Sequence, residues 1–439
     1  MPQNFLSCDR DQPMLLPPDL RDWLDDDHLV WFVIDAVAEL DLGPFYASYR
    51  ADGHGRAAHD PQMMVTLFAY AYAVGERSSR GIERRCREDV AFRVICANQA
   101  PDHATIARFR VRHEEAPAGL FGQVLGLCGR AGIVDVGVIA VDGTKLAAAA
   151  SDGAIRTYEQ ITAEILAEAG RIDAAEDEIH GEARGDELPE GLRTPNGRRA
   201  WLREATEELE RERAERRANQ RYEAYRARGV MKNGRRFGAP PKPYSPPEAP
   251  EGKLNTTDPD ARRMKFGRNF MHAYNAQAVT TSDQIIVAAE ITTKGGDFEE
   301  LDPMISAAER ELVGAGVEAS PGVVLADAGY WSNDHIDSLR GRGIVPIVAA
   351  DTTRNRPRRT RLGGPYDFMR RVMATEAGGE LYSKRQCMVE PVFAQIKTNR
   401  RIDRFKRRGR AAVRSEWRLV AATHNLLKLH RHQLAAATA

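Results

Sequence analysis

Cysteine is scarce in this sequence, and its few copies form no recognisable pattern. Five cysteines occur in 439 residues, and no two of them are spaced as Cys-x-x-Cys. Disulfide-stapled secreted domains and zinc-ribbon proteins need paired cysteines, so neither class fits. Scattered thiols are typical of a reducing compartment, and we expect a cytoplasmic protein.

Long hydrophobic runs are missing as well. No segment reaches the roughly 18 consecutive apolar residues that span a bilayer. The first residues show no basic stretch followed by an apolar one, which a secretion signal would need. We therefore expect no membrane partner.

Net charge is the third absence. The chain carries 63 basic and 63 acidic side chains, so its formal net charge is zero and does not indicate a nucleic-acid partner. The charges are unevenly distributed, because acidic residues are dense in 159–215 and basic residues are dense in 354–431. Such asymmetry allows a local phosphate-binding surface on a neutral protein.

The first part of the chain contains short helical patterns. Apolar spacing and capping residues predict helices at 19–42, 60–75, 79–87, 89–96, 102–115 and 119–131. We expect residues 1–18 to be a tail, and residues 19–131 to be an all-α region of the helix-turn-helix-like kind that binds DNA. Arg108 and Arg112 lie four residues apart on one helix face, where they either contact DNA or form a solvated surface.

Two aspartates follow apolar runs. VGVIAVDGTK, residues 136–145, predicts a buried strand that ends at Asp142, with Gly143 and Thr144 turning the chain. VVLADAGY contains a similar strand that ends at Asp327. Parallel neighbouring strands would bring both carboxylates to one edge of the sheet, where open α/β proteins place their sites.

A third acid, Glu390, lies in the stretch YSKRQCMVEPVFAQIK. Its apolar neighbours predict a helix that begins between Tyr382 and Glu390, with Pro391 in the first turns. Carboxylates on three separate elements supply the hard oxygen ligands that Mg²⁺ or Mn²⁺ prefers. Two such ions about 3.5–4 Å apart can catalyse phosphoryl transfer without a protein nucleophile.

The remaining pattern predicts a mixed sheet with one long interruption. Strands are expected at 274–279, 284–291, 322–326 and 343–350, and helices at 299–312 and 333–340. With the Asp142 strand, this is the element order of a ribonuclease-H-like α/β fold, a mixed sheet flanked by helices. Residues 157–255 interrupt it with two charged segments that predict a helical hairpin, followed by a Pro/Gly-rich linker.

Several stretches together resemble bacterial insertion-sequence transposases of the DDE type, which have a ribonuclease-H-like catalytic domain. They are RSSRGIERRCREDVAFR, NQAPDHATIARFR, VDGTK, NTTDPDARRMK, YNAQ, DAGYWS and YSKRQCMVEPVFAQIK. The resemblance implies that Asp142, Asp327 and Glu390 are the catalytic residues and hold the metal ions. Its Y-R-E-K signature further implies roles for Tyr382, Arg385 and Lys397.

Spacing gives partial support to that signature. Four residues separate Arg385 from Glu390, one more than in the usual form of the family. Lys397 stands seven residues after Glu390, which is two helical turns, and a lysine there can bind a DNA phosphate as a point charge. Arg400 and Arg401 open the basic run RRIDRFKRRGR, which we expect to follow a DNA backbone.

These patterns favour a DNA transposase of a bacterial mobile element. It would bind double-stranded DNA at the inverted-repeat ends of an insertion sequence, cleave with two Mg²⁺ or Mn²⁺ ions and transfer the strands to target DNA, as a homodimer on DNA. The alternatives are a catalytically inactive DNA-binding relative and a ribonuclease-H-like nuclease. A haloacid-dehalogenase-like phosphatase is excluded, because Ala140 stands where its nucleophilic aspartate is needed.

The expected catalytic domain comprises residues 132–156 and 256–430, and residues 431–439 are expected to be a tail. Asp297, in the loop sequence GGDFEE, is a candidate for an additional acid behind the site. For Asp258 and Asp260 the plainest interpretation is a helix cap before Ala261.

Overall fold

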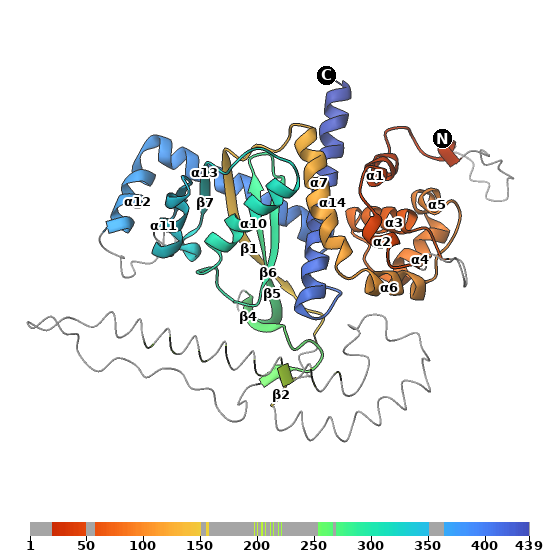
Figure 1. The fold of residues 1–439 in the computed structure, drawn as a ribbon, viewed down its shortest axis with the longest axis horizontal. Coiled ribbons are helices and arrows are strands. Elements are labelled where there is room, and N and C mark those ends of the chain that lie inside the picture. Colours follow the sequence, from red (N-terminus) through yellow and green to blue (C-terminus); the bar gives the residue numbers. More distant parts are fainter. Residues whose placement is uncertain are drawn as a thin grey trace, which may run out of the picture.

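The computed structural model describes residues 20–49, 58–150, 155–157, 253–266, 269–350 and 364–438, with single helical positions between 197 and 221. A sheet lies at the centre of the molecule, and the N-terminal helices lie to one side of it (Figure 1). The long C-terminal helix α14 (Arg410–Thr438) runs between these two parts.

The described part of the N-terminal region is helical. Its elements are η1 (Leu20–Trp23), α1 (Leu29–Ala38), α2 (Gly43–Tyr46), α3 (Pro61–Ala73), α4 (Ser79–Glu88), α5 (Val90–Ile95), α6 (His103–Arg112) and α7 (Ala116–Arg130). The side chains of Asp60, Ser78, Asp89 and Asp102 cap α3 to α6 by accepting backbone N–H bonds. The helices predicted between residues 60 and 131 are therefore confirmed.

The single helix predicted at 19–42 is wrong. The structure has the short 3-10 helix η1 and then a separate helix, α1. His28 begins α1, because its Nδ1 accepts the Val30 N–H at 3.2 Å. The Trp31 indole donates to the Asp25 carbonyl at 3.1 Å and closes the turn between the two helices.

The sheet of the described chain has six strands in the order β4-β5-β1-β7-β8, with β6 also paired to β5. They are β1 (Val138–Ala147), β4 (Arg262–Phe266), β5 (Asn269–Thr281), β6 (Ile286–Thr292), β7 (Val323–Ala326) and β8 (Val345–Val348). β1, β7 and β8 are parallel, whereas β4, β5 and β6 join antiparallel. The predicted fold class, a ribonuclease-H-like mixed sheet flanked by helices, is confirmed.

β1 does not end at Asp142, so the predicted turn at Gly143 and Thr144 is wrong. The strand continues to Ala147 and pairs with β5 throughout, with Asp142 opposite Ala278. Only its pairing with β7 stops early, at Ala140. Antiparallel pairing with the long strand β5 keeps the polar second half of β1 extended, which apolar patterning does not reveal.

Helices cover the sheet. They are α10 (Leu301–Gly314), α11 (Asn333–Gly341), α13 (Glu376–Ala394) and α14, while α12 (Gly364–Ala374) packs against α13. α13 packs across β1, β5 and β7, whereas α10 packs on β5 and β6. α13 begins at Glu376, capped by Thr375, rather than near Tyr382 as predicted. The sequence pattern predicts neither α12 nor α14, and residues 431–438 are the end of α14 rather than a tail.

α14 connects the two parts of the molecule. It packs against α1, α3 and α7 as well as β6. The Asn425 side chain bonds both backbone groups of Ile286, accepting at 2.9 Å and donating at 2.8 Å. The Trp417 indole donates to the Gln277 carbonyl at 2.9 Å. Within the described ranges no helix, α14 included, is both long and apolar enough to cross a membrane.

The predicted insertion leaves and re-enters the fold at one place. β2 (Ile155–Thr157) pairs antiparallel with β3 (Lys253–Asn255), so the two ends of the segment lie side by side. The described positions between 197 and 221 are helical. The rest of the predicted hairpin and its linker lies outside the described residues.

Candidate active site

Asp142 and Asp327 come together through the register of two parallel strands. Ala140 of β1 and Leu325 of β7 are the last residues that pair, and Asp142 and Asp327 each lie two residues beyond them. Neighbouring strands lie about 4.8 Å apart, and the two acids are close enough for the charge of Asp327 to act on Asp142. Asp327 follows β7 directly and caps a 3-10 turn, η5 (Ala328–Tyr330), by accepting the Gly329 N–H at 2.7 Å.

Arg385 of α13 reaches the first of these acids. Its Nη1 lies 2.9 Å from Asp142 Oδ2, with 17% and 21% of the two side chains exposed. Burial raises the pKa of Asp142 to about 6, the charge of Arg385 opposes that rise, and the neighbouring Asp327 adds to it. Tyr382, one turn before Arg385, is half-buried, and burial raises its pKa. The structure thus brings together four of the predicted residues.

Glu390 lies on the same helix but does not join this group. Its side chain is exposed and accepts a hydrogen bond from Gln386 at 3.1 Å. Its backbone position is nevertheless between Arg385, which contacts Asp142, and Lys397, which contacts the next turn of β1. The helix therefore carries Glu390 alongside β1, with its carboxylate turned outward.

Pro391 lies inside α13, not at its start, and the fold compensates for it. Proline has no N–H, so the Cys387 carbonyl one turn earlier loses its usual helical donor. The Gln284 side chain, from the turn between β5 and β6, donates to that carbonyl at 3.0 Å. The sheet thereby fixes α13 at the residue that follows Glu390.

Lys397 contacts β1 beyond Asp142. Its Nζ donates to Thr144 Oγ1 at 2.8 Å and to the Lys145 carbonyl at 3.1 Å, and lies 5.5 Å from the centre of the Phe266 ring. The residue belongs to a π-helical turn, Gln395–Asn399, which follows α13 directly. Such turns often occur at functional sites. Burial lowers the pKa of Lys397.

The predicted DNA contact of Arg400 is wrong. This side chain is 3% exposed, and its guanidinium donates to the carbonyls of Tyr72 and Val420 and to the Thr423 hydroxyl. Burial lowers its pKa to about 9. Gly75 makes the packing possible, because a Cβ there would lie 2.5 Å from the Arg400 carbonyl oxygen. Arg400 therefore joins the N-terminal helices to α14.

The rest of the basic run behaves differently. Arg401 is exposed and has a positive φ of 54°. The next residues run beside the end of β1, where Phe405 N–H donates to Ala147 O at 2.8 Å. Buried Glu416 accepts the backbone N–H groups of Lys406 and Arg407 at 3.0 Å each. Backbone anchoring thus leaves most of these cationic side chains at the surface.

Asp258 and Asp260 also hold the segment that leads into α14. Asp258 is fully buried, and its Oδ1 accepts the Tyr274 hydroxyl at 2.7 Å and the Gly409 N–H at 3.3 Å. Asp260 Oδ2 accepts the Arg410 N–H at 2.7 Å at the start of α14. The helix cap proposed for Ala261 is wrong, because strand β4 follows. Both acids bond backbone groups that are 150 and 151 residues away, and local sequence patterns do not predict such partners.

Arg108 and Arg112 of α6 are both exposed. Arg112 lies over the Tyr49 ring, 4.7 Å from its centre, and Arg108 Nε donates to Ala104 O at 3.3 Å. Arg110, between them, instead turns inward and donates to the Arg77 carbonyl at 2.6 Å. The two predicted arginines thus share the outer face of α6.

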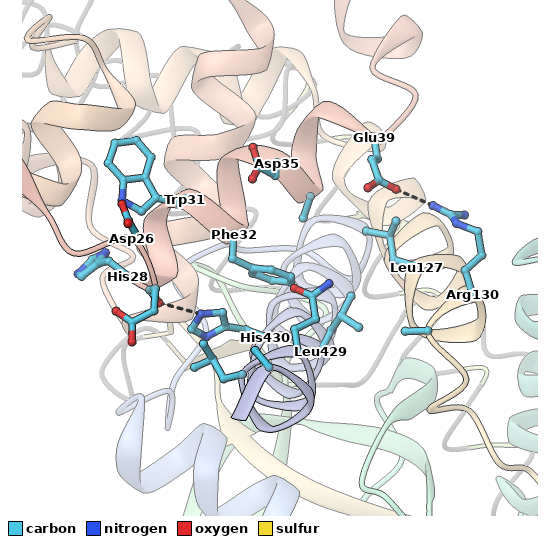
Figure 2. Close-up of a pocket in the computed structure, with 16 residues that line it drawn as sticks. Asp26, His28, Trp31, Phe32, Asp35, Glu39, Leu127, Arg130, Leu429 and His430 are labelled. Atoms are coloured by element: carbon cyan, nitrogen blue, oxygen red, sulfur yellow. Dashed lines mark hydrogen bonds and ion pairs between the residues drawn. The ribbon is translucent and has the colours of Figure 1, made fainter. Parts of the chain in front are cut away.

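A groove between α1, α7 and α14 contains none of the predicted site residues. Asp26, His28 and Asp35 line it from the α1 side (Figure 2). Two contacts cross the groove. Arg130 forms a 2.9 Å ion pair with Glu39, and His430 Nε2 lies 3.3 Å from the Asp27 carbonyl oxygen. Its acidic rim is unsuited to a DNA phosphate.

The carboxylates suit a divalent cation, but the described side chains form no complete ion site. No group of three or more His, Cys, Asp or Glu residues among them is arranged to hold a metal. The two aspartates repel each other, and a cation between them would relieve that repulsion. The carboxylate oxygens of Asp142 and Asp327, with Glu390 on the adjacent helix, are of the donor type that hard divalent cations prefer.

Two protein families match this chain. One, described as a transposase domain (DUF772), matches residues 18–112, and the other, described as a transposase DDE domain, matches residues 247–426. No curated protein and no solved structure matches it. Asp142 lies between the matched segments, whereas Asp327, Glu390 and Lys397 lie within the second. The chain belongs to the DDE transposases of insertion sequences and is a DNA transposase.

Proposed function

We propose that this transposase cleaves double-stranded DNA at the ends of its element and joins the freed ends to target DNA with Asp142, Asp327 and Glu390. The observation that carries this proposal is the register of β1 and β7, which sets both aspartates two residues beyond the last pair and close enough to interact. Bound Mg²⁺ or Mn²⁺, two ions in all, would activate the attacking oxygen and stabilise the leaving one.

The protein's own groups supply the rest of the chemistry. Asp142 and Asp327 hold negative charge at one point of the sheet edge, where it attracts cations. Glu390 completes the acid set from α13, whose attachment to β1 at two points keeps it beside them. Arg385 and Tyr382 adjoin Asp142 and orient the DNA strand there.

DNA binding extends from the site along two basic surfaces. Lys397 and Arg401 follow α13 and take phosphates near the cleaved bond. Arg108 and Arg112 on the outer face of α6 take phosphates of the element end. In this proposal residues 19–131 bind DNA, residues 132–156 and 256–430 catalyse, and two protomers act together on DNA, since two ends must be paired.

Cleavage of a labelled inverted-repeat duplex by the purified protein tests this function. Asp142→Asn, Asp327→Asn and Glu390→Gln should each reduce Mg²⁺-dependent cleavage at least about 10³-fold, since each removes an ion ligand. Duplex binding should persist, because the phosphate-binding cations remain. Asp337→Asn, an exposed acid on α11, is the matched control. Cleavage retained in Asp142→Asn would disprove the assignment.

A further inference from the structure

Asp297 lies in a cradle of amides behind the candidate site. Asn275 Nδ2 and Gln277 Nε2 both donate to its Oδ1, at 2.8 and 2.7 Å. The two amides are two residues apart on β5, so they extend from the same face of the sheet. Asp297 belongs to the loop between β6 and α10, so these bonds join that loop to β5.

The cradle touches β1 one residue after Asp142. Gly143 pairs with Gln277, and a Cβ at Gly143 would collide with the Gln277 amide nitrogen and lie 2.8 Å from Asp297 Oδ1. Only glycine leaves room for the side chains here. Because faces alternate along a strand, the cradle lies on the opposite face from the side chain of Asp142.

Tyr330 links the cradle to Asp327. Its buried hydroxyl donates to Gln277 Oε1, and it stands three residues after Asp327, in the turn that Asp327 caps. Gly329 lies between the two acids, because a Cβ there would be 2.9 Å from Asp327 Oδ1 and 3.6 Å from Asp297 Oδ2. Asn275, Gln277, Asp297 and Tyr330 are called the amide cluster below.

We propose that Asp297 is a positioning residue that fixes the turn of Asp327 in line with Asp142. Its carboxylate accepts the Gln277 amide nitrogen and thereby sets the orientation of that amide. The amide oxygen then faces the Tyr330 hydroxyl and holds the turn. A flipped amide would set its oxygen against the Asp297 carboxylate, which can only accept, so Asp297 determines the orientation. This role rests on the function proposed above.

Four variants separate this role from direct ion binding. Asp297→Asn keeps an oxygen for both amides and removes the charge, whereas Asp297→Ala removes the acceptor. Gln277→Glu sets a second carboxylate against Asp297 and removes a donor. The double variant Asp297→Asn with Gln277→Glu restores one donor and one acceptor with exchanged roles. Asp302→Asn on α10, an acid bonded to Ser338 and Arg342 of the neighbouring helix and its C-cap, is the control.

Two measurements are compared across these variants. Single-turnover cleavage should fall at least about 10-fold in Asp297→Ala and Gln277→Glu, because a bond network is broken. It should stay within about 3-fold of wild type in Asp297→Asn, and largely recover in the double variant. Backbone hydrogen exchange at residues 328–330 needs no metal or DNA, and should accelerate in Asp297→Ala and Gln277→Glu but not in Asp297→Asn.

Each outcome decides the matter. Unchanged exchange at residues 328–330 in Asp297→Ala would overturn the positioning role whether or not the protein cleaves. Loss of cleavage in Asp297→Asn as severe as in Asp142→Asn would also overturn it and make Asp297 an ion ligand. If wild type does not cleave but exchange follows the expected pattern, the proposed function fails and the positioning role stands.

Discussion

The two faces of β1 around Asp142 carry different kinds of side chain. On one face the side chains of the amide cluster are neutral apart from Asp297 and bonded to one another, and Gly143 leaves them no spare room. On the other face Arg385 and Lys397 reach β1 from α13 and its π-helical turn by long, partly exposed side chains.

This difference assigns different tasks to the two faces. Interlocked amides lose several bonds when one member moves, so the amide cluster sets geometry. Long cations lose little when they release an acceptor and rebind a phosphate, so the face with Arg385 and Lys397 can exchange its partners for DNA. The aspartates lie between a rigid support and an adjustable one.

Gly143→Ala should have the largest effect, because it forces a methyl group into the amide cluster. We expect a loss of about 1–3 kcal/mol in the free energy of unfolding and loss of detectable cleavage. Urea unfolding and the duplex assay measure the two effects. Gly137→Ala, just before β1, meets only the flexible Asp135 side chain at 3.2 Å and should be tolerated. Equal effects of both variants would contradict the rigid support.

Arg400 and Arg401 are adjacent, but Arg400 is a buried structural residue and Arg401 is exposed and free to bind DNA. Arg400→Met removes the guanidinium that donates to three buried acceptors and should cost about 2–3 kcal/mol of unfolding free energy. Arg401→Asn keeps a residue that tolerates positive φ, so its stability should stay within about 0.5 kcal/mol of wild type. The salt dependence of its DNA binding should weaken by about one phosphate contact. A stable Arg400→Met protein with weakened DNA binding would restore the original prediction.

Much of this fold was predictable because its signals are local. Asp60, Ser78, Asp89 and Asp102 cap helices within three residues of themselves, and a cap needs nothing from the rest of the chain. The apolar runs before Asp142 and Asp327 likewise record burial on both faces of parallel strands. Where residue type and near neighbours decide the structure, the prediction was correct.

The wrong predictions concern residues whose environment is determined by partners distant in sequence. Arg400 and Arg401 look alike in sequence, and only the packing of α3 against α14 buries the first. Pro391 normally starts or ends a helix, but Gln284 from another element replaces its missing bond. The sequence marks Asp297 as an acid in a loop, whereas the amides that donate to it lie on β5 and are distant in sequence. Such information is tertiary.

Asp258 is a buried acid whose partners in the described part of the chain are the Tyr274 hydroxyl and backbone N–H groups. Burial raises its pKa from the usual 3.8 to about 6. A raised folded pKa means that the stabilising contribution is complete below about pH 4 and is lost as pH rises through about 6. Relative to Asp258→Asn, wild type should lose at most about 3 kcal/mol of unfolding free energy across that window. Urea unfolding at several pH values measures it. A flat difference would contradict the burial, and exposed Asp283→Asn is the control.

Thr144→Val should have the smallest effect and tests the adjustable face most directly. Valine matches threonine in shape but removes the Oγ1 that accepts Lys397, while the Lys145 carbonyl still accepts it at 3.1 Å. We expect unfolding free energy to change by less than about 1 kcal/mol and cleavage to fall no more than about 3-fold, because the lysine keeps a partner. Lys397→Met removes the charge itself and should weaken duplex binding with a reduced salt dependence. If Thr144→Val were as damaging as Gly143→Ala, both faces of β1 would be rigid, and the exchange of Lys397 between β1 and DNA would be untenable.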